Sequence, residues 1–451
     1  MRRTKVIFTF GPSCYSEERL SRLFLLADGI RLNFSHGDLD RKRWVIQRIR
    51  KLEDIHGKYV PIIGDLQGGC IRLGDFGEIR IIKGRKYKFG FNQGIIIPNK
   101  DVFSIIEEDD IVLVDDGRFR FRVNKVGDLY FIAEAEVSGV LGSKKTFLIK
   151  NKNIHLPPLT RKDLDDLRFA IDIGIEYIAL SFVKCRRDLE ILKRYIEEFG
   201  GDQWILAKIE CMDAVNRLDE ILDCADGVIV ARGDLGLYFN LEEIPKVQSE
   251  IIGRSVRRGK ITILATQILE SMRFNPQPTR SEVADIYKAV EEGVDAIMLT
   301  GETAVGRYPV EAVSWAVRIL NEADNVIKPR HEGIDESIYD KFAKGVLAMT
   351  EVIGGKLIGY SRRGNTARRI SRYRPSNTVY IVVPSKDTAR KINILYSLEP
   401  ILTDSDNYEE AFKHALDKLK ERGILCIGDI VVYTLGIREK ATDMVRVEFI
   451  H

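Results

Sequence analysis

The sequence is short of the residues that build disulfide frameworks, zinc sites and histidine-based catalytic centres. It has six cysteines and six histidines in 451 residues. The cysteines are scattered, and no two of them form a C-x-x-C pair. This pattern argues against a zinc site or a disulfide framework and for a reducing compartment. The histidines do not cluster either, and only His36, in a loop after an expected strand, is placed to touch a ligand.

Long apolar runs and the common nucleotide-binding motifs are also missing. No stretch approaches the roughly 18 apolar residues of a membrane helix, and the start, MRRTKVIFTFGPS, is too short in apolar residues for a signal-peptide core. Neither G-x-x-x-x-G-K-[ST] nor G-x-G-x-x-G occurs. The net charge of +3, from 70 basic and 67 acidic residues, is too balanced to indicate a polyanion partner. We therefore expect a cytoplasmic protein that binds no membrane and no nucleic acid.

What the chain does contain is a regular alternation of strand-like and helix-like segments. The expected strands are VIFTF (6–10), GIRLNF (29–34), VPIIGD (60–65), EYIALSF (176–182), WILAKIE (204–210), DGVIVA (226–231), KITILAT (260–266) and DAIMLT (295–300). A helix-like segment follows each strand. After the third strand, VPIIGD, an insert described below comes before the helix. Eight such units match a (β/α)8 barrel; a doubly wound sheet is the competing topology.

The alternation breaks twice, which divides the chain into three parts. Between residues 66 and 155 only short strand patterns with Gly and Asp turns occur, which indicates a β-rich insert. After the polar segment NVIKPRHEGID a new alternation begins with a helix over about 336–353, followed by the expected strands KLIGY (356–360), TVYIVV (378–383), ILCIGDIVVYTL (424–435) and MVRVEFI (444–450). We therefore expect a barrel of residues 1–65 and 156–328, an inserted lid of residues 66–155, and an α/β domain of residues 335–451.

The strand WILAKIE raises a question, because Lys208 and Glu210 lie two residues apart in an otherwise apolar segment. Side chains two apart on a strand point to the same side, and burying a lone charge is costly. In a (β/α)8 barrel the chemistry takes place at the C-terminal strand ends. Polar residues follow other expected strands in RLNFSHG (31–37), DLQGG (65–69), SFVK (181–184), ARGDLG (231–236), ATQ (265–267) and TGET (300–303). We expect all of them to meet at one polar mouth.

Glu210 and Asp234 are candidate Mg²⁺ ligands, since two carboxylates with substrate oxygens and water make a usual Mg²⁺ site. A simple ion pair between Glu210 and Lys208 is the alternative. Gly233 allows backbone N–H groups to approach a carboxylate or phosphate, although a plain loop is the alternative for this turn. Lys208 and Arg31 are suited to neutralise a phosphoryl group during its transfer, which depends on positioning and charge stabilisation.

An ordered set of motifs along nearly the whole chain resembles pyruvate kinase. The motifs are TFGPS, RLNFSHG, LPPLTRKDL, ALSFVK, AKIE, DGVIVARGDLG, ILATQILESM, PTRSEVADI, AIMLTGETAVGRYP and RYRP. The resemblance implies an α/β fold, namely a (β/α)8 TIM barrel with an inserted small β-barrel lid domain and a C-terminal α/β regulatory domain. It implies transfer of the phosphoryl group of phosphoenolpyruvate to ADP, giving pyruvate and ATP, the final step of glycolysis.

The resemblance also implies roles for residues on the phosphoenolpyruvate side. Lys208 would stabilise the phosphoryl group and the enolate, and Thr266 would lie near the face where the enolate is protonated. Arg31 and Arg72 would contact phosphates. Glu210 and Asp234 would hold Mg²⁺ or Mn²⁺. The backbone groups that would receive the substrate carboxylate are those of Ala231, Gly233 and Asp234.

On the nucleotide side the resemblance points to two further groups. The positions that would contact ADP or ATP are Asn33, His36, Arg72 and Lys162. The oxygen donors that match the family's potassium site belong to Asn33, Ser35, Asp65 and the carbonyl of Leu66.

One loop departs from the family pattern. Many members read Asp-Thr-Lys-Gly-Pro-Glu-Ile-Arg where this chain reads DLQGGCIR (65–72). Two glycines replace a stiffer hinge, so we expect lid motion to differ. Members that work without potassium tend to have Leu-Gln after the Asp, as in Leu66 and Gln67. Cys70 supplies no positive charge, but it removes the negative charge that the cation would balance. Potassium therefore remains a candidate ligand, while we expect activity without it.

The C-terminal segment YSRRGNTARRISRYRP (360–375) carries six arginines. Its start resembles the phosphate-binding effector loop of the family, through Ser361, Arg362, Arg363, Gly364, Asn365 and Thr366. We expect a phosphorylated allosteric effector there; a solvated basic face or an interface is the alternative. No aromatic platform accompanies the arginines, so nucleic-acid binding is not indicated. A homotetramer is expected from the resemblance alone.

Two other classes of function compete with an active pyruvate kinase. Another phosphoenolpyruvate-handling barrel, such as a carboxylase or an aldolase-like lyase, would keep the metal carboxylates but would need no lid over a nucleotide; the β insert and Lys162 argue against it. A catalytically dead regulator would be expected to lose Lys208, Asp234 or Thr266, and all three are present.

Overall fold

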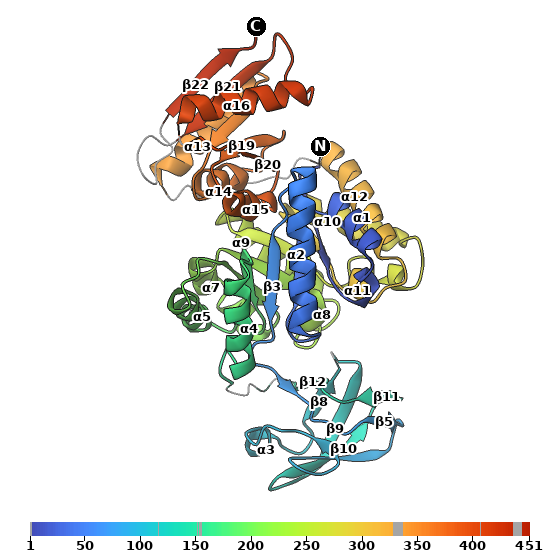
Figure 1. Cartoon of the computed structure of the whole chain (residues 1–451). Helices are drawn as coiled ribbons and strands as arrows, with labels where there is room; N and C mark the ends of the chain where they lie inside the picture. Colours follow the sequence, from blue (N-terminus) through green and yellow to red (C-terminus); the bar gives the residue numbers. More distant parts are fainter. Residues whose placement is uncertain are drawn as a thin grey trace.

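The computed structural model describes residues 2–115, 117–150, 152, 156–327, 337–405, 407–435 and 444–451. The chain forms three bodies in a row (Figure 1): a β-rich lid at one end, a barrel in the middle, and an α/β domain at the other end. Most of the expected linker NVIKPRHEGID lies outside the described residues, as do His155 and His331. No helix in the described part of the chain combines the length and apolar character needed to cross a bilayer.

In the described residues, eight parallel strands close into the expected barrel in the order β1-β17-β16-β15-β14-β13-β3-β2. Their bounds are β1 Lys5–Thr9, β2 Gly29–Asn33, β3 Ile62–Leu66, β13 Tyr177–Leu180, β14 Trp204–Ile209, β15 Gly227–Ala231, β16 Ile261–Ala265 and β17 Ala296–Leu299. The register sets Thr9 beside Arg31 and Asn33 beside Asp65. The (β/α)8 prediction is confirmed, and the doubly wound alternative is excluded.

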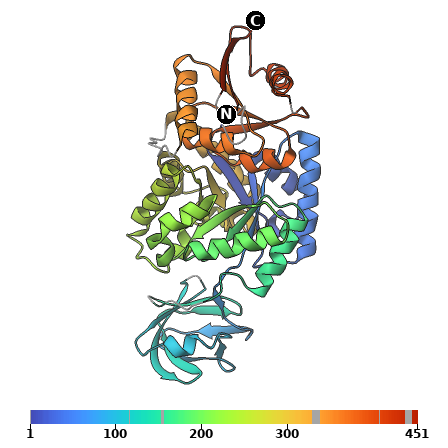
Figure 2. The same cartoon turned by 90° about the vertical axis from the view of Figure 1, so that its left-hand side faces the viewer.

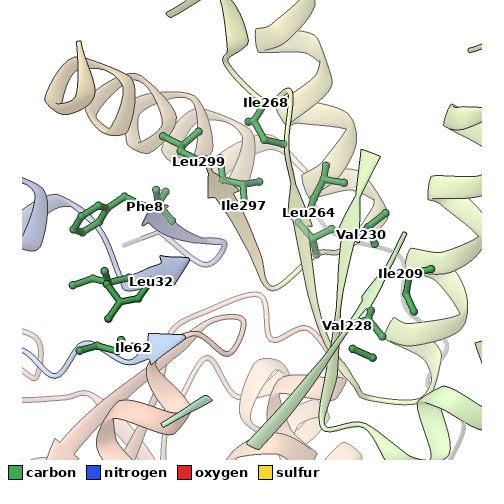
Figure 3. Close-up of a cluster of buried hydrophobic side chains, with 14 of the residues drawn as sticks. Phe8, Leu32, Ile62, Ile209, Val228, Val230, Leu264, Ile268, Ile297 and Leu299 are labelled. Carbon is green, nitrogen blue, oxygen red and sulfur yellow. The ribbon is translucent and has the colours of Figure 1, made fainter. Parts of the chain in front are cut away.

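The alternation within each strand divides its side chains between two layers. In β14, Ile205, Ala207 and Ile209 belong to the apolar layer beneath the helices, and Figure 3 shows part of this layer. Leu206 faces the other way, into the barrel interior, and Lys208 shares its side of the strand. The barrel interior is therefore lined by apolar side chains beneath the mouth and by charged side chains at the mouth.

Helices surround the barrel (Figure 2). They are α1 Glu17–Leu26, α2 Leu39–His56, α4 Arg161–Asp172, α5 Arg186–Glu198, α6 Met212–Asn216, α7 Leu218–Cys224, α8 Arg232–Leu235, α9 Ile244–Arg257, α10 Arg280–Glu292, α11 Gly301–Ala304 and α12 Pro309–Val326, with 3₁₀ turns at Pro12–Cys14 and Glu270–Arg273. Thr160 caps α4 in a reciprocal capping box with Asp163. Thr279 and Glu282 do the same for α10.

The lid is a curled sheet with its own core. Its strands are β4 Ile71–Arg72, β5 Glu78–Ile81, β6 Lys86–Gly90, β7 Ile95–Ile96, β8 Ile111–Val114, β9 Phe119–Gly127, β10 Tyr130–Ala135, β11 Gly139–Gly142 and β12 Thr146–Ile149, with one short helix, α3 Val102–Ile105. Phe89 stacks on Phe131 with ring centroids 4.9 Å apart, and Phe121 meets Phe89 edge-on at 5.0 Å. This separate aromatic core allows the lid to move as a unit.

The C-terminal domain contains elements that the sequence pattern did not reveal. Its bounds are α13 Ile338–Val352, β18 Lys356–Tyr360, α14 Asn365–Arg372, β19 Val379–Val383, α15 Lys386–Asn393, β20 Leu398–Leu402, α16 Tyr408–Glu421, β21 Ile430–Leu435 and β22 Met444–Phe449. β20 was missed because Glu399 and Pro400 interrupt its apolar pattern. The expected strand over 424–435 begins only at Ile430, since Asp429 accepts the N–H of Cys426 in a turn.

Candidate active site

Lys208 stands at the centre of the barrel mouth. Its Nζ donates to Ser181 Oγ at 2.8 Å and lies 3.3 Å from Asp65 Oδ2 and 2.8 Å from Glu210 Oε1. Burial alone would lower the pKa of this ammonium, but the two carboxylates raise it above its ordinary value. Lys208 therefore remains charged. The strand does present its pair into a polar mouth, and the ion pair between Lys208 and Glu210 exists as well.

Asp65 and Arg31 form the adjacent charged pair. Arg31 Nε and Nη2 both lie 2.6 Å from Asp65 Oδ2, and Arg31 Nη1 donates to Thr9 Oγ1 at 3.2 Å. Burial would raise the pKa of Asp65, but Lys208 and Arg31 hold it below its usual range. Asp65 thus pairs with two cations, and Lys208 pairs with Glu210 as well, so the four side chains form one charged network at the mouth.

Glu210 and Asp234 have the character expected of divalent-metal ligands. Glu210 Oε2 accepts the N–H of Phe182 at 2.7 Å. Its Oε1 faces Lys208 out of line for a hydrogen bond, so among the described residues this buried oxygen has no hydrogen-bond partner. Asp234 lines the same cavity. An orphaned carboxylate oxygen beside a second carboxylate fits Mg²⁺, which takes one or two protein carboxylates together with substrate oxygens and water.

A cavity of about 470 Å³ separates the barrel mouth from the lid. Nine of the residues expected at the site line it: Arg31, Asn33, Ser35, His36, Asp65, Arg72, Lys208, Glu210 and Asp234. The lid contributes residues that sequence reasoning missed: Asp115, Ser143, Lys144, Lys145 and Thr146. Lys145 pairs with Asp115 at 2.9 Å. The only sequence signal for them was a Gly-Ser-Lys-Lys turn, which does not reveal that the turn faces the barrel.

The expected nucleotide-side residues do not all reach this cavity. Asn33 Oδ1 accepts the N–H of Ser35 at 2.9 Å, which shapes the loop after β2. His36 is exposed at the rim of the cavity, and desolvation together with nearby cations, first Arg72, lowers its pKa. Lys162 lies beside the cavity rather than on its wall; it donates to Phe34 O at 2.7 Å and pairs with Asp166.

The hinge to the lid is tightly packed at its two glycines. Gly68 has φ +69°, and a Cβ there would lie 2.2 Å from the carbonyl oxygen of Ser181. A Cβ on Gly69 would lie 2.5 Å from Pro157 O. Gly68 therefore requires glycine, and the packing of this hinge leaves no room for a Cβ on Gly69. Cys70, which follows, is largely buried, and burial raises the pKa of its thiol.

The oxygen donors expected to hold potassium lie together but are already engaged. Ser181 Oγ donates to Leu66 O at 2.9 Å and approaches Asp65 Oδ1 at 3.3 Å. Asp65 Oδ2 is neutralised by Lys208 and Arg31, as described above. The carboxylate that a potassium ion would share therefore already has two cationic partners.

The ARGDLG turn meets the loop after β16 behind the cavity. The N–H of Gly233 donates to Thr266 Oγ1 at 2.8 Å. Ala231 ends β15 and is buried. Thr266 does not line the cavity itself, so its relation to the site runs through Gly233.

Three of the six arginines in the segment 360–375 contact the barrel. Arg368 pairs with Asp226 at 2.8 Å, Arg372 donates to Arg258 O at 2.6 Å, and Arg374 pairs with Asp295 at 2.7 Å. The interface alternative thus holds for these. In the effector loop itself, Ser361, Gly364 and Thr366 are buried, and Arg362, Arg363 and Asn365 are exposed. Gly364 has φ +84° and precedes α14.

Comparison with known proteins gives one consistent result. Residues 1–313 match the family model "Pyruvate kinase, barrel domain", and residues 341–448 match "Pyruvate kinase, alpha/beta domain". The chain is 35% identical to a pyruvate kinase of Aeropyrum pernix over 98% of both chains, and 33% identical to one of Clostridium acetobutylicum over the full length of both. The crystal structure of pyruvate kinase from Pyrobaculum aerophilum superposes with a TM-score of 0.89, at 33% identity, over 100% of this chain and 99% of that one.

Proposed function

Because the chain belongs to the pyruvate kinase family, and therefore transfers the phosphoryl group of phosphoenolpyruvate to ADP, we propose that the cavity between barrel and lid is where it does so. The observation that carries this proposal is the cluster around Lys208: two carboxylates within 3.3 Å keep the ammonium charged. A fixed charge of this kind stabilises the phosphoryl group in flight and the enolate that it leaves.

The other residues would each serve one part of the reaction. Arg31 and Arg72 contact phosphate oxygens. The substrate carboxylate is received by backbone groups of the ARGDLG turn: Ala231, Gly233 and Asp234. Thr266 lies near the carbon at which the enolate takes its proton. The adenine nucleotide side comprises Asn33, His36, Lys162 and, from the lid, Lys145.

Pyruvate kinases in general depend on Mg²⁺ and K⁺. We assign the divalent ion, Mg²⁺ or Mn²⁺, to Glu210 and Asp234, supported by the orphaned oxygen of Glu210. When bound, such an ion supplies positive charge to the phosphate and enolate oxygens. Potassium would take oxygens of Asn33, Ser35, Asp65 and Leu66, but Lys208 and Arg31 already neutralise Asp65, so we propose that turnover does not require it.

A direct assay tests the proposal. Purified protein with phosphoenolpyruvate, ADP and Mg²⁺ should form pyruvate and ATP in equal amounts, and omission of either ADP or Mg²⁺ should stop the reaction. Pyruvate formed equally well without nucleotide would contradict the proposal. Mg²⁺ binding, measured by calorimetry without substrates, should weaken in Glu210→Gln and in Asp234→Asn but not in Glu198→Gln, an exposed surface control on α5.

We further propose that the loop Ser361–Thr366 binds a phosphorylated effector. Its support is a buried Gly364 in the left-handed region, at the start of α14, with the exposed Arg362 and Arg363 beside it. Activation by sugar phosphates or nucleotides should vanish in the double variant Arg363→Ala, Thr366→Ala while basal turnover survives, since coupling is separable from chemistry. The surface variant Arg187→Ala should keep activation. No activation of the wild type by such compounds would reject the proposal.

The remaining expectations concern organisation. We infer a barrel of residues 1–65 and 156–328, a lid of 66–155 and a C-terminal domain of 335–451, supported by sheets that are separate in the three parts, two of them in the lid. A homotetramer is supported by the edge strand β22, where Val445, Val447 and Phe449 are exposed.

A cytoplasmic location is supported by the six cysteines, all in the described residues and none in a disulfide.

A further inference from the structure

Arg232 joins three elements behind the active site. Its Nη2 donates to Gln267 O at 2.8 Å and to Thr266 O at 3.1 Å, and its Nε approaches Thr266 O at 3.3 Å. Its Nη1 donates to Asp285 on α10 at 2.6 Å. The side chain is only 10% exposed. One guanidinium thus connects the ARGDLG turn, the loop after β16 and α10.

The two carbonyls that it holds belong to residues with unusual backbone. Thr266 has φ +66° and Gln267 has φ +54°. Consecutive non-glycine residues in the left-handed region are rare, and a β-branched residue such as Thr is a true outlier there. Such conformations persist only where their surroundings hold them, and they cluster at functional sites.

The rest of the loop is fixed by other residues. Glu302 Oε1 accepts the N–H of Leu269 at 3.0 Å, and Glu282 accepts both the N–H and the hydroxyl of Ser271. The part that contains the two left-handed residues is held by Arg232. There the hydroxyl of Thr266 accepts the N–H of Gly233, the residue next to Arg232.

We propose that Arg232 is a positioning residue for the reaction: it holds the left-handed backbone at Thr266 and Gln267, and so keeps the Thr266 hydroxyl beside Gly233. This inference rests on the proposed function, which assigns the substrate carboxylate to backbone groups of the ARGDLG turn and the protonated face of the enolate to Thr266. Without the guanidinium, the loop relaxes toward ordinary backbone angles and the hydroxyl moves. Arg232 itself touches neither substrate nor metal.

The planar fork of arginine is what this arrangement requires. A guanidinium donates in several fixed directions at once, whereas an ammonium is a compact point charge on a flexible stem. Lysine at position 232 would keep the charge opposite Asp285 but could not hold both carbonyls. Arg232→Lys therefore separates the positioning role from simple charge neutralisation. Arg254→Lys on α9 is the matched control, because Arg254 also forms ion pairs, with Asp219 and Glu250, but lies away from the site.

The first experiment measures kcat, the KM values of both substrates, and the exchange of pyruvate methyl protons for deuterium in D₂O. Arg232→Lys should lower kcat and the exchange rate by about 10²-fold, which is the expected cost when a reacting group is displaced by roughly 1 Å. The KM for ADP should stay within about threefold, since the nucleotide side is untouched. Arg254→Lys should change none of these. An Arg232→Lys variant that keeps more than about a third of wild-type kcat would overturn the proposal.

The second experiment is a double-mutant cycle with Thr266→Val. If Arg232 acts through Thr266, adding Arg232→Lys to Thr266→Val should lower kcat by less than about threefold further, whereas independent effects would multiply. If the losses of kcat in the two single variants multiply in the double variant, Arg232 does not act through Thr266, and the positioning role is wrong. Full turnover in Thr266→Val alone would instead show that the proposed function assigns Thr266 wrongly, so the two failures are distinct.

Folding is checked by thermal unfolding of each variant. If Arg232→Lys does not fold, Asp285→Asn replaces it in both experiments, because it removes the partner that orients the guanidinium while keeping the volume. Asp285→Asn should lower kcat by about tenfold. Added to Thr266→Val, it should cause little further loss of kcat. Wild-type kcat in folded Asp285→Asn would count against the proposal.

Discussion

The two ends of the barrel carry the same kinds of charged residue, but the partners of these residues differ. The end opposite the mouth is called the closed end here. There Asp295 accepts hydrogen bonds from both Nη atoms of Arg374, at 2.7 and 3.0 Å, and from the N–H groups of Thr262 and Tyr396. At the mouth, Lys208 and Glu210 lie beside an open cavity, and a buried oxygen of Glu210 lacks a hydrogen-bond partner among the described residues. The mouth is therefore the end where a metal ion or substrate can approach a buried carboxylate oxygen.

The C-terminal domain supplies the partners of the charged residues at the closed end. Arg390 on α15 of the C-terminal domain forks onto Glu53 of α2, with Nη2 at 2.7 Å and Nε at 2.9 Å from Oε2. Glu53 also receives the N–H of Val60 at 2.8 Å. The C-terminal domain thus supplies permanent partners at the closed end, whereas at the mouth we propose that substrate and metal are the partners. The comparison predicts that changes at one end affect stability and changes at the other affect turnover.

The largest expected effect is at the closed end. Arg374→Met leaves the buried Asp295 without its cation, and breaking a buried pair in this way costs about 3–5 kcal/mol. Chemical denaturation should show that loss, while kcat per folded molecule should stay near the wild-type value. Lys386→Met, which breaks an exposed pair with Asp54, should leave stability nearly unchanged. A large loss of kcat in folded Arg374→Met would break the comparison.

At the mouth the effect should be on turnover. Lys208→Met removes the fixed charge that stabilises the transferring group, which is worth roughly 2.7–4 kcal/mol, or 10²–10³ in kcat. Its carboxylate neighbours keep Arg31 and the N–H of Phe182 as partners, so the fold and Mg²⁺ binding should persist. Lys193→Met on the surface of α5 is the control. Turnover above about a third of wild type would show that Lys208 is structural.

Potassium should have a smaller effect. Because Asp65 is neutralised by two protein cations and Cys70 brings no negative charge, added KCl should raise turnover by less than about tenfold, which corresponds to about 1.4 kcal/mol. The measurement compares tetraalkylammonium buffer with and without KCl at matched ionic strength. A greater rise would show that the four oxygen donors outweigh the altered loop.

The smallest effect concerns His36 and pH. Its pKa is lowered from 6.5 in the folded chain, so the unfolded chain binds the proton more readily, and stability falls as the pH drops through that value. His36→Gln should flatten the curve of unfolding free energy against pH between about 7 and 5. His414→Gln should not, since His414 lies on α16, far along the chain from the mouth. An unchanged curve for His36→Gln would mean that the imidazole titrates as if free.

The sequence was sufficient for the barrel because period-two strands and capped amphipathic helices are local signals. The β14 pair Lys208 and Glu210 could be oriented from spacing alone. β20 could not be found, since its polar Glu399 pairs with Arg422 at 2.5 Å, a partner distant in sequence. The lid residues Lys145 and Asp115 were missed for the same reason, because their approach to the mouth depends on how the insert folds back.

The arginines of the C-terminal segment show the same limit within the site. Sequence reasoning treated them as one basic group. Arg374 and Arg363 are eleven positions apart, but one is buried against Asp295 and the other is exposed. Only the docking of the domain onto the barrel distinguishes them. Arg232 was likewise invisible, since its role depends on backbone carbonyls, which every residue has.

The way in which the lid is joined to the barrel has a consequence for evolution. The chain leaves at Gln67 and Gly68, whose N–H groups both point at Asp163, and it returns at Pro157, in contact with Gly69. The exit and re-entry of the insert therefore touch, so its length enters the folding of the barrel only through a loop-closure entropy that grows slowly. Lids of different length can therefore join the barrel at this junction without shifting its strands, provided that Gly68 keeps its left-handed backbone.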